Sequence, residues 1–598
     1  MRNLRLWMRL FRWSWRRAPF VTAVALAVAA LSVAAAAGIA LSLRMVVDGS
    51  VQGALGTALA GAMAAALCYA AGTALDSASG DLRTLAADKV YIFDLTPRIF
   101  SLIADIEGLD HLERTDFLDR IDLVRGSGWQ IATSLWALVL ALQSALQLVV
   151  TLLLLGTVSP WLLALLLFAA VPVWTDRRAK HHVASAEQAS AEAMRLQRHL
   201  LRLATRADSG KDIRVAGAGD EIARRQVAAT EEAVCLRHRA RVRAAGWRFG
   251  GWAFFAAGFL AALALVVRQA ADDHASTGDV VMAIAVATGL RRTVQHAVGA
   301  TTDAWGSLMA IESYFWLEDY AKADRSRTAG TVTAPAVLSR GITFDKVSYR
   351  YPGTDRPAIT DISLSIPAGT VVAVVGEYGS GKTTLVKLLA KFYAPDSGRI
   401  TVDGTDLADL GTTGWRSRIS AAFQDFGRFQ TVFAEGVGLG DLPHVTDRAR
   451  IAHALREADG SALLARLPAG LDTQLGRDLG GVELSEGQWQ RVALARSVMR
   501  EDPVLFILDE PTASLDAPSE HAIFERHMDR ARELAARTGA ITVIVSHRFS
   551  TVTGADLILV LDKGRLIESG THEELVAREG GQYADLYGLQ AQAYSESG

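Results

Sequence analysis

Long apolar stretches dominate the first half of the chain. The run from Phe20 to Leu43 is long enough to cross a bilayer core of about 30 Å, which takes roughly 20 helical residues. Five similar stretches follow, and the fourth of the six is short and contains Pro172. The pattern predicts six transmembrane helices, at about residues 20–43, 54–75, 131–155, 158–174, 250–267 and 280–309.

Charged residues are unevenly shared between the segments that join these stretches. The loops on one side are residues 48–53, 156–160 and 268–279. They contain one Arg, whereas segments 76–130 and 175–249 are long and rich in charge. Because cytoplasmic loops carry the excess of Lys and Arg, we expect an integral protein of a bacterial plasma membrane with both termini in the cytoplasm. The long segments keep a helical pattern, so we expect helices that extend into the cytosol and turn back near residues 108–121 and 208–222.

The pattern changes in the second half of the chain. After Tyr320 the apolar periodicity stops, and from Gly341 short β-branched runs (VVAVV, VLFILD, ITVIVS) alternate with helical stretches. This alternation is typical of a mostly parallel sheet with crossover helices. We predict a multi-domain chain with an all-α, six-helix transmembrane domain (1–325), a linker (326–340) and an α/β nucleotide-binding domain (341–598).

Composition excludes some functions. The net charge of −2 argues against a strongly basic nucleic-acid binder, and six membrane spans argue against a soluble protein that acts on nucleic acid. The two cysteines, Cys68 and Cys235, fall in an expected membrane helix and an expected cytosolic helix, so a disulfide framework is not expected.

A phosphate-binding loop follows the first strand of the α/β half. VVAVVGEYGSGKTT, residues 371–384, is a buried strand followed by G-x-x-x-x-G-K-T and a helix. Glycines leave room for backbone N–H groups to wrap phosphates, Lys382 reaches the outer phosphates and Thr383 offers a hydroxyl to Mg²⁺. The expected ATP-binding residues of this loop are Gly376, Gly379, Ser380, Gly381, Lys382, Thr383 and Thr384.

Two later strand ends supply the groups that hydrolysis requires. Five apolar residues run into Asp509, a candidate Mg²⁺ ligand, and Glu510 beside it is the candidate general base. IVSH places His547 at the end of another strand, where an imidazole could sense the γ-phosphate. We therefore expect catalytic roles for Glu510 and His547, with ATP and Mg²⁺ as cofactors.

These motifs, in this order, resemble those of ABC transporter ATPase domains. The matching residues are GEYGSGKTT, Gln424 in AAFQD, LSEGQ at 484–488, LFILDEPT, Ser514 to Asp516 and Ser546-His547. The whole chain resembles an exporter-type half-transporter, in which one membrane domain precedes one P-loop ATPase domain. The ATPase match is specific, whereas the membrane half matches in topology alone.

The resemblance implies that two ATPase domains pair head to tail around shared ATP. Ser485, Gly487, Gln488 and Asp516 would then act on the partner's ATP, with a helix N-terminus directed at the γ-phosphate. It also implies that Tyr351 stacks on adenine, that Gln424 joins Thr383 and Asp509 around Mg²⁺, and that the two cytosolic turns press on the ATPase domains. The partner is a second copy or a related half-transporter, in a lipid bilayer.

One residue departs from the usual LSGGQ signature, because Glu486 replaces the first glycine. A carboxylate near a triphosphate should repel it unless the side chain turns away or pairs with an arginine. We expect that it turns away and that hydrolysis survives.

The sixth span contains Arg291 and Arg292, roughly 17 Å from its outer edge. We find no Asp or Glu at similar depth in the other spans, so these arginines, with His296, are expected to contact an acidic group on the cargo or to reach an interface. Gln143, Gln147 and Thr151 share one helical face, where hydrogen bonds between helices are favoured over cargo contact.

The expected function is ATP-driven export of a peptide, antibiotic, lipid or other amphipathic compound. An importer on the same fold is the alternative within transport. A nucleotide-sensing regulator or gated channel is the alternative outside it, and Glu510 argues against that reading because a sensor has little need of a general base.

Overall fold

A computed structural model of the chain describes residues 2–158, 160–271, 277–511, 517–546 and 552–595. The chain forms two compact units. The membrane unit is Met1–Ser101 with Asp122–Trp316, and the nucleotide unit is Leu102–Ile121 with Leu317–Gly598. The chain passes between them three times, each time inside a helix: α4, α5 and α10.

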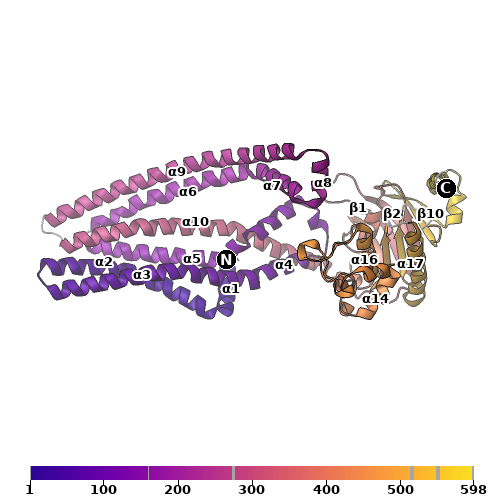
Figure 1. Cartoon of the computed structure of the whole chain (residues 1–598), viewed down its shortest axis with the longest axis horizontal. Helices are drawn as coiled ribbons and strands as arrows, with labels where there is room; N and C mark the ends of the chain where they lie inside the picture. Colours follow the sequence, from indigo (N-terminus) through magenta and orange to yellow (C-terminus); the bar gives the residue numbers. More distant parts are fainter. Residues whose placement is uncertain (1, 159, 272–276, 512–516, 547–551, 596–598) are drawn as a thin grey trace. The chain divides into compact units, whose positions relative to one another are not determined.

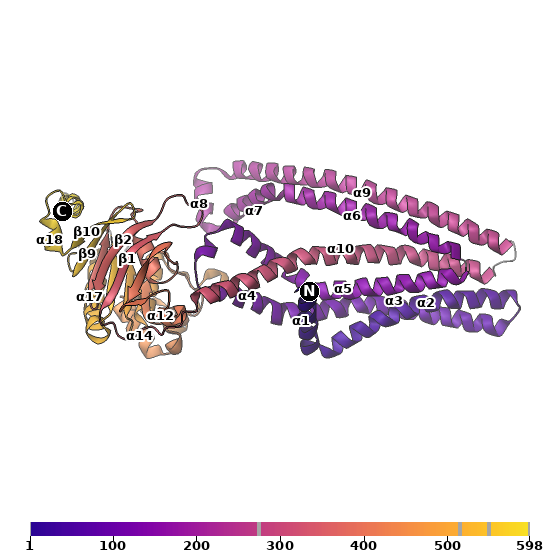
Figure 2. The ribbon, with the colours of Figure 1, turned by 180° about the vertical axis from the view of Figure 1, so that it is seen from behind.

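The membrane unit is built from long helices (Figure 1). Including the helices that cross into the other unit, these are α1 (Arg2–Arg17), α2 (Pro19–Val51), α3 (Leu55–Val90), α4 (Thr96–Ala104), α5 (Thr115–Val158), α6 (Leu165–Ala189), α7 (Ala191–Thr205), α8 (Ala207–Val215), α9 (Gly219–Ala271) and α10 (Thr277–Thr328). A π-helical turn, Tyr91–Leu95, joins α3 to α4, and the 3-10 turn Pro160–Ala164 precedes α6. Helix α6 lies alongside α9 (Figure 2).

Several of these helices have the length and hydropathy of membrane spans. Within the described residues, the segments that qualify are Pro19–Val51, Leu55–Ala104, Thr115–Leu154, Pro160–Ala189 and Gly219–Gln269. The sixth expected span falls in α10, where many side chains lie outside the described set. The helices run well past the expected spans. Their charged ends lower the local hydropathy, which ends the expected span, but these ends remain helical.

Small residues let helices α2 and α3 pack closely. A Cβ atom added to Gly61 would lie 2.9 Å from the backbone nitrogen of Val46, and one added to Gly38 would lie 2.7 Å from the sulfur of Cys68. Close backbone approach of this kind is how membrane helices gain packing energy without a hydrophobic driving force. Both cysteines are free.

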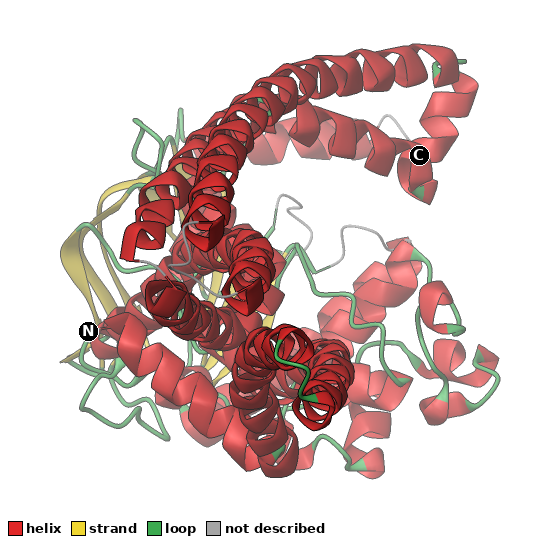
Figure 3. Cartoon of the chain, turned by 90° about the vertical axis from the view of Figure 1, so that its left-hand side faces the viewer, coloured by secondary structure: helices red, strands yellow, loops and turns green. Residues whose placement is uncertain are grey.

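The described strands of the nucleotide unit, yellow in Figure 3, form two sheets. The antiparallel sheet has the order β2-β1-β4-β5, and the larger sheet has the order β10-β9-β3-β8-β7-β6, in which β10 alone is antiparallel. The strands are β1 (Gly341–Tyr349), β2 (Ile359–Pro367), β3 (Val371–Val375), β4 (Ser397–Val402), β5 (Thr405–Asp406), β6 (Ile419–Ala422), β7 (Leu505–Asp509), β8 (Ile541–Val545), β9 (Leu557–Asp562) and β10 (Arg565–Gly570).

The strands β3, β7 and β8 of the larger sheet are buried along their whole length. The helices of this unit that follow β3 are α11 (Lys382–Leu389), α12 (Thr412–Arg416), α13 (Phe433–Gly438), α14 (Arg448–Glu457), α15 (Ser461–Arg466), α16 (Glu486–Val498), α17 (Ala517–Thr538), α18 (His572–Val576) and α19 (Gln582–Ser595). Since β3, β8 and β7 are parallel neighbours, the carboxyl ends of these strands lie at one sheet edge.

The boundary between the units differs from the expected one at residue 325. Leu317 and Ala321 of α10 are buried, and the rings of Phe117 and Tyr320 lie 4.9 Å apart, so the end of α10 packs on the first expected turn, residues 108–121. The expected linker, 326–340, is also packed: Val332 donates its N–H to the carbonyl of Asp409. Packing therefore continues where the apolar periodicity stops.

Candidate functional site

The loop after β3 has the backbone conformation of a phosphate cradle. Gly376 (φ 150°), Gly379 (φ 79°) and Gly381 (φ 103°) adopt conformations that favour glycine. A Cβ atom on Gly376 would lie 2.2 Å from the carbonyl oxygen of Leu561. Gly381 is the N-cap of α11, so the loop opens onto a helix N-terminus, where N–H groups are available to an anion.

Lys382 lies over this loop. Its Nζ donates to the carbonyl oxygens of Gly376 and Glu377, each at 2.9 Å. Burial lowers the pKa of Lys382, and the carboxylates of Glu510 and Asp509 oppose that shift. Ser380, also buried, has a hydroxyl without a partner in the described part of the chain. The cradle therefore offers an ammonium and a hydroxyl toward phosphates.

Asp509, the last residue of β7, faces the start of α11. The Thr383 hydroxyl lies 3.5 Å from Asp509 Oδ1, and Oδ2 is buried without a partner among the described residues. Burial raises the pKa of Asp509 to about 6, against the hydrogen bond from Thr383. A buried carboxylate beside a hydroxyl, with one oxygen unsatisfied, fits the oxygen ligands that Mg²⁺ prefers.

Asp509→Asn is expected to stabilise the nucleotide-free protein. The folded pKa lies above the ordinary value near 4, so the folded state holds the extra proton between about pH 4 and 6, and stability falls as pH rises through that window. The asparagine removes this cost, roughly 2 kcal/mol at pH 7.5 and less at pH 5.

Thermal unfolding at both pH values, with and without Mg²⁺ and ATP, measures this effect. In the presence of ATP, addition of Mg²⁺ should raise the melting temperature of the wild type but not that of the variant. An equal gain at pH 5 and pH 7.5, or a lower melting temperature, would contradict the account.

Glu510 follows in a strained conformation. Its φ of 49° lies in the left-handed region, and its N–H donates to the carbonyl of Val545 on β8 at 3.0 Å. Gln424, after β6, donates from Nε2 to Glu510 Oε2 at 3.0 Å. The structure thus gathers Lys382, Thr383, Gln424, Asp509 and Glu510 at one sheet edge. His547 and Asp516 lie outside the described residues.

Tyr351 lies in an aromatic cluster beside α11. Its hydroxyl is 3.0 Å from that of Thr384, and Lys387 Nζ lies 5.7 Å from its ring centroid. The rings of Tyr349 and Tyr393 pack on it edge to face, at 5.1 and 5.4 Å. One edge of this ring is therefore fixed next to the phosphate loop.

The same cluster contacts the segment Leu102–Ile121, which contains the first expected turn and belongs to the nucleotide unit. The Tyr349 hydroxyl lies 3.4 Å from Asp110 Oδ1, and the Tyr393 hydroxyl donates to Glu113. Burial raises the pKa of Tyr349, of Tyr393 and of Asp110, which favours their protonated forms. Sequence motifs do not indicate these contacts.

Arg416 anchors the turn on its other side. Its Nη2 donates to the carbonyls of Glu107 at 2.7 Å and Lys391 at 2.9 Å, and its guanidinium stacks on Phe392 at 4.8 Å. Leu109 N–H donates to the carbonyl of Phe392 at 3.2 Å. The second expected turn, around α8, belongs to the membrane unit.

The signature residues begin helix α16. Ser485 is the N-cap, and its hydroxyl accepts from Gln488 N–H at 3.4 Å while Gln488 Oε1 accepts from Ser485 N–H at 2.8 Å. Gly487 lies in the first turn. Glu486 pairs with Arg428, so the arginine alternative holds rather than the favoured one, in which the side chain turns away. The sequence motifs do not identify Arg428 as this partner, because it lies 58 positions before Glu486.

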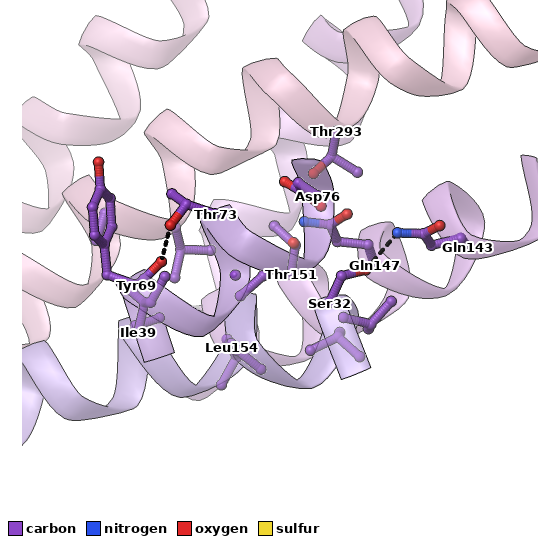
Figure 4. A pocket seen from close by; sticks show the side chains of 18 residues that line it. Ser32, Ile39, Tyr69, Thr73, Asp76, Gln143, Gln147, Thr151, Leu154 and Thr293 are labelled. Carbon is purple, nitrogen blue, oxygen red and sulfur yellow. Dashed lines mark hydrogen bonds between the residues drawn. The ribbon is translucent and has the colours of Figure 1, made fainter. Parts of the chain in front are cut away.

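Polar side chains line a cavity of about 230 Å³ in the membrane unit (Figure 4). They come from α2, α3, α5 and α10: Ser32, Tyr69, Thr73, Asp76, Gln143, Gln147, Thr151 and Thr293. Gln143 donates to Ser32 Oγ at 2.6 Å, which confirms the expected hydrogen bond between helices.

Asp76 corrects one expectation about the membrane unit. Asp76 lines this cavity together with Thr293, which directly follows Arg292 in the sequence. The sequence had predicted no Asp or Glu in the other spans at the depth of Arg291 and Arg292. Helix α3 continues through Asp76, one residue past the expected end of the second span. Arg291, Arg292 and His296 belong to α10, but their side chains lie outside the described set.

Comparison with known proteins identifies relatives of both halves. A family model described as ABC transporter matches residues 359–513. The chain is 37% identical over 322 residues to an ATP-dependent lipid A-core flippase of Pseudomonas fluorescens, covering 54% of this chain and 51% of that protein. A flippase of the same description from Burkholderia orbicola is 36% identical over 341 residues, covering 56% and 54%. The matches thus span about half the length of these curated relatives.

A solved structure matches over nearly the whole chain. It is a bacterial Atm1-family ABC exporter with ATP bound, with a TM-score of 0.73 and 25% sequence identity, over 96% of this chain and 99% of that one. The likeness therefore includes the helical half, which the family model does not reach.

Proposed function

The chain has the fold and domain order of an ABC exporter half-transporter, and from this premise we propose that it exports an amphipathic compound from the cytoplasm by hydrolysing ATP. The observation that carries the proposal is the cluster at the sheet edge. We assign the binding of phosphates to Lys382 and the glycine loop, and the acceptance of a proton from water to Glu510, whose carboxylate accepts a hydrogen bond from Gln424. A protein that only senses nucleotide needs no such base.

Thr383 and Asp509 are the residues that would hold Mg²⁺ in this site, with Gln424 at its margin. The ion supplies neutralising charge to the phosphates when bound. Tyr351 is proposed to stack on adenine, because its ring is fixed beside α11. His547 is proposed to contact the γ-phosphate on its motif alone.

The active form is proposed to be a dimer of two such chains, or of this chain with a related half-transporter. The described hydrogen bonds of Ser485 and Gln488 stay within their own cap, which leaves the N-terminus of α16 exposed for a neighbouring domain. Ser485, Gly487, Gln488 and Asp516 would complete the partner's ATP site. ATP hydrolysis and transport would then require both copies.

The cargo is proposed to place a polar head group in the cavity of the membrane unit. Asp76, Gln147 and Thr293 point toward one another in Figure 4. At about 230 Å³ the cavity is smaller than pockets that enclose a whole drug-sized ligand, so it suits one head group with the apolar remainder outside. Arg291, Arg292 and His296 are proposed to add contacts to an acidic group.

Substitution within the cavity tests this placement. Gln147→Leu is expected to lower cargo transport at least fivefold, because it removes a donor and an acceptor from the wall. Gln226→Leu, the same change on α9, is the control. Equal transport by the two variants would refute the assignment.

Profiling of cells that express the wild type or Glu510→Gln tests the function itself. A compound that accumulates inside cells with the variant identifies an exporter and its cargo. One that remains in the medium means an importer. Identical profiles, with ATP hydrolysis by the purified protein, would refute transport and favour regulation.

A further inference from the structure

Glu486 occupies a position that the proposed function reserves for phosphate. It is the first residue of α16, directly after the N-cap Ser485, and its side chain is 52% exposed. A carboxylate there is favoured by the helix dipole, so the fold tends to keep it at this end. The same dipole would attract the γ-phosphate of a partner's ATP. Glu486 and that phosphate therefore compete for one positive end.

Arg428 is the counter-ion that the fold supplies. Its Nη2 pairs with Glu486 Oε2, although the two residues are 58 positions apart in the chain. The arginine itself is 51% exposed, so its guanidinium remains open to a second anion. Its segment begins at Gln424, which contacts the general base Glu510 at 3.0 Å.

Helix α16 itself fixes the segment that carries Arg428. Arg496, near the other end of this helix, donates from Nη1 to the carbonyl of Gly427 at 3.2 Å, and its guanidinium lies 4.5 Å from the ring centroid of Phe429. Arg496 Nε also donates to the carbonyl of Gly436 at 2.9 Å. Both neighbours of Arg428 are thus held on α16, which places its guanidinium at the helix start.

The pair does not serve chiefly to stabilise the fold. Ion pairs with both members half-exposed contribute little to stability, because water screens them and ordering the side chains costs entropy. Its main effect is on charge: an unpaired Glu486 would repel a triphosphate, whereas the pair is neutral.

We propose that Arg428 is a positioning residue of the composite ATP site, which neutralises Glu486 so that the N-terminus of α16 accepts the partner's γ-phosphate. This inference rests on the proposed dimeric ATPase. It predicts that substitution of Arg428 and substitution of Glu486 change the KM for ATP in opposite directions. Loss of a merely structural contact would not produce opposite changes.

A double-mutant cycle on ATP hydrolysis tests the proposal. Arg428→Ala should raise the KM for ATP on the order of tenfold, because one uncompensated charge faces the triphosphate. Glu486→Gly should lower the KM, about threefold, because the arginine remains. The double variant should return to within about twofold of the wild type. Arg448→Ala, which breaks the similarly exposed pair with Asp472, is the control and should leave the KM unchanged.

Two results would overturn the proposal: an Arg428→Ala variant with the wild-type KM, or a double variant as impaired as Arg428→Ala. Measuring ATP affinity through the same cycle in the Glu510→Gln background makes the test independent of turnover. Absence of hydrolysis by the wild type would then count against the proposed function, while the affinities would still decide the role of Arg428.

Discussion

Glu510→Gln is expected to keep ATP bound and to lower the rate of ATP hydrolysis by about 10³-fold. The size follows from loss of a general base, which typically contributes 10² to 10⁴ in rate. Glutamine has nearly the same shape, and its amide oxygen can still accept the hydrogen bond from Gln424. The phosphate loop and Asp509 are untouched, so binding of ATP should persist.

Hydrolysis and ATP affinity of the purified protein in lipid discs measure both parts of this result. Glu525→Gln makes the same chemical change on the exposed face of α17 and should behave as the wild type. Hydrolysis by Glu510→Gln within tenfold of the wild type would contradict the assignment of Glu510 as the base.

Arg416→Ala is expected to separate hydrolysis from transport. Transport should fall at least tenfold, whereas hydrolysis without cargo should stay within about threefold. Transport should fall because the guanidinium holds the carbonyl of Glu107, in the segment Leu102–Ile121, beside Lys391 and Phe392. Hydrolysis should persist because the described contacts of Arg416 do not include the phosphate loop. Loss of these contacts would weaken the attachment of this segment to the rest of the nucleotide unit.

The controls for this experiment come from the same unit. Arg399→Ala removes an exposed arginine that pairs with Asp345 on the antiparallel sheet, and it should affect neither activity. Tyr393→Phe deletes only the hydroxyl that donates to Glu113, so a smaller loss of transport is expected. Thermal unfolding distinguishes uncoupling from misfolding. Parallel losses of hydrolysis and transport in a folded Arg416→Ala protein would contradict the separation.

Local motifs made most of the residue cluster at the sheet edge predictable. The glycine loop, Asp509 and Glu510 each sit at the end of a short buried strand, and parallel pairing brings such ends together. The expectation that Glu486 turns away was wrong, because its pairing with Arg428 depends on a loop that Arg496 fixes from the far end of α16. Periodicity carries no information about such a contact.

Contacts across long stretches of chain were not predictable. Glu113 and Tyr393 are 280 residues apart, and neither belongs to a recognisable motif. Asp76 was missed for a different reason, because hydropathy ends the second span where a carboxylate lowers it, while α3 continues to Val90. The limits of long helices depend on packing and capping as well as on apolar content.

Each of the three chain crossings between the units lies within a helix. A helix turns by about 100° per residue, and its backbone hydrogen bonds fix both its length and its twist. A crossing within a helix is therefore stiffer than one within a loop. We therefore expect any rotation of the nucleotide unit to act on α4, α5 and α10 as torque, because each crossing lies within a helix and not within a loop. One residue inserted into a helix at a crossing would rotate the part of that helix beyond the insertion by about 100°, which is more than a quarter turn.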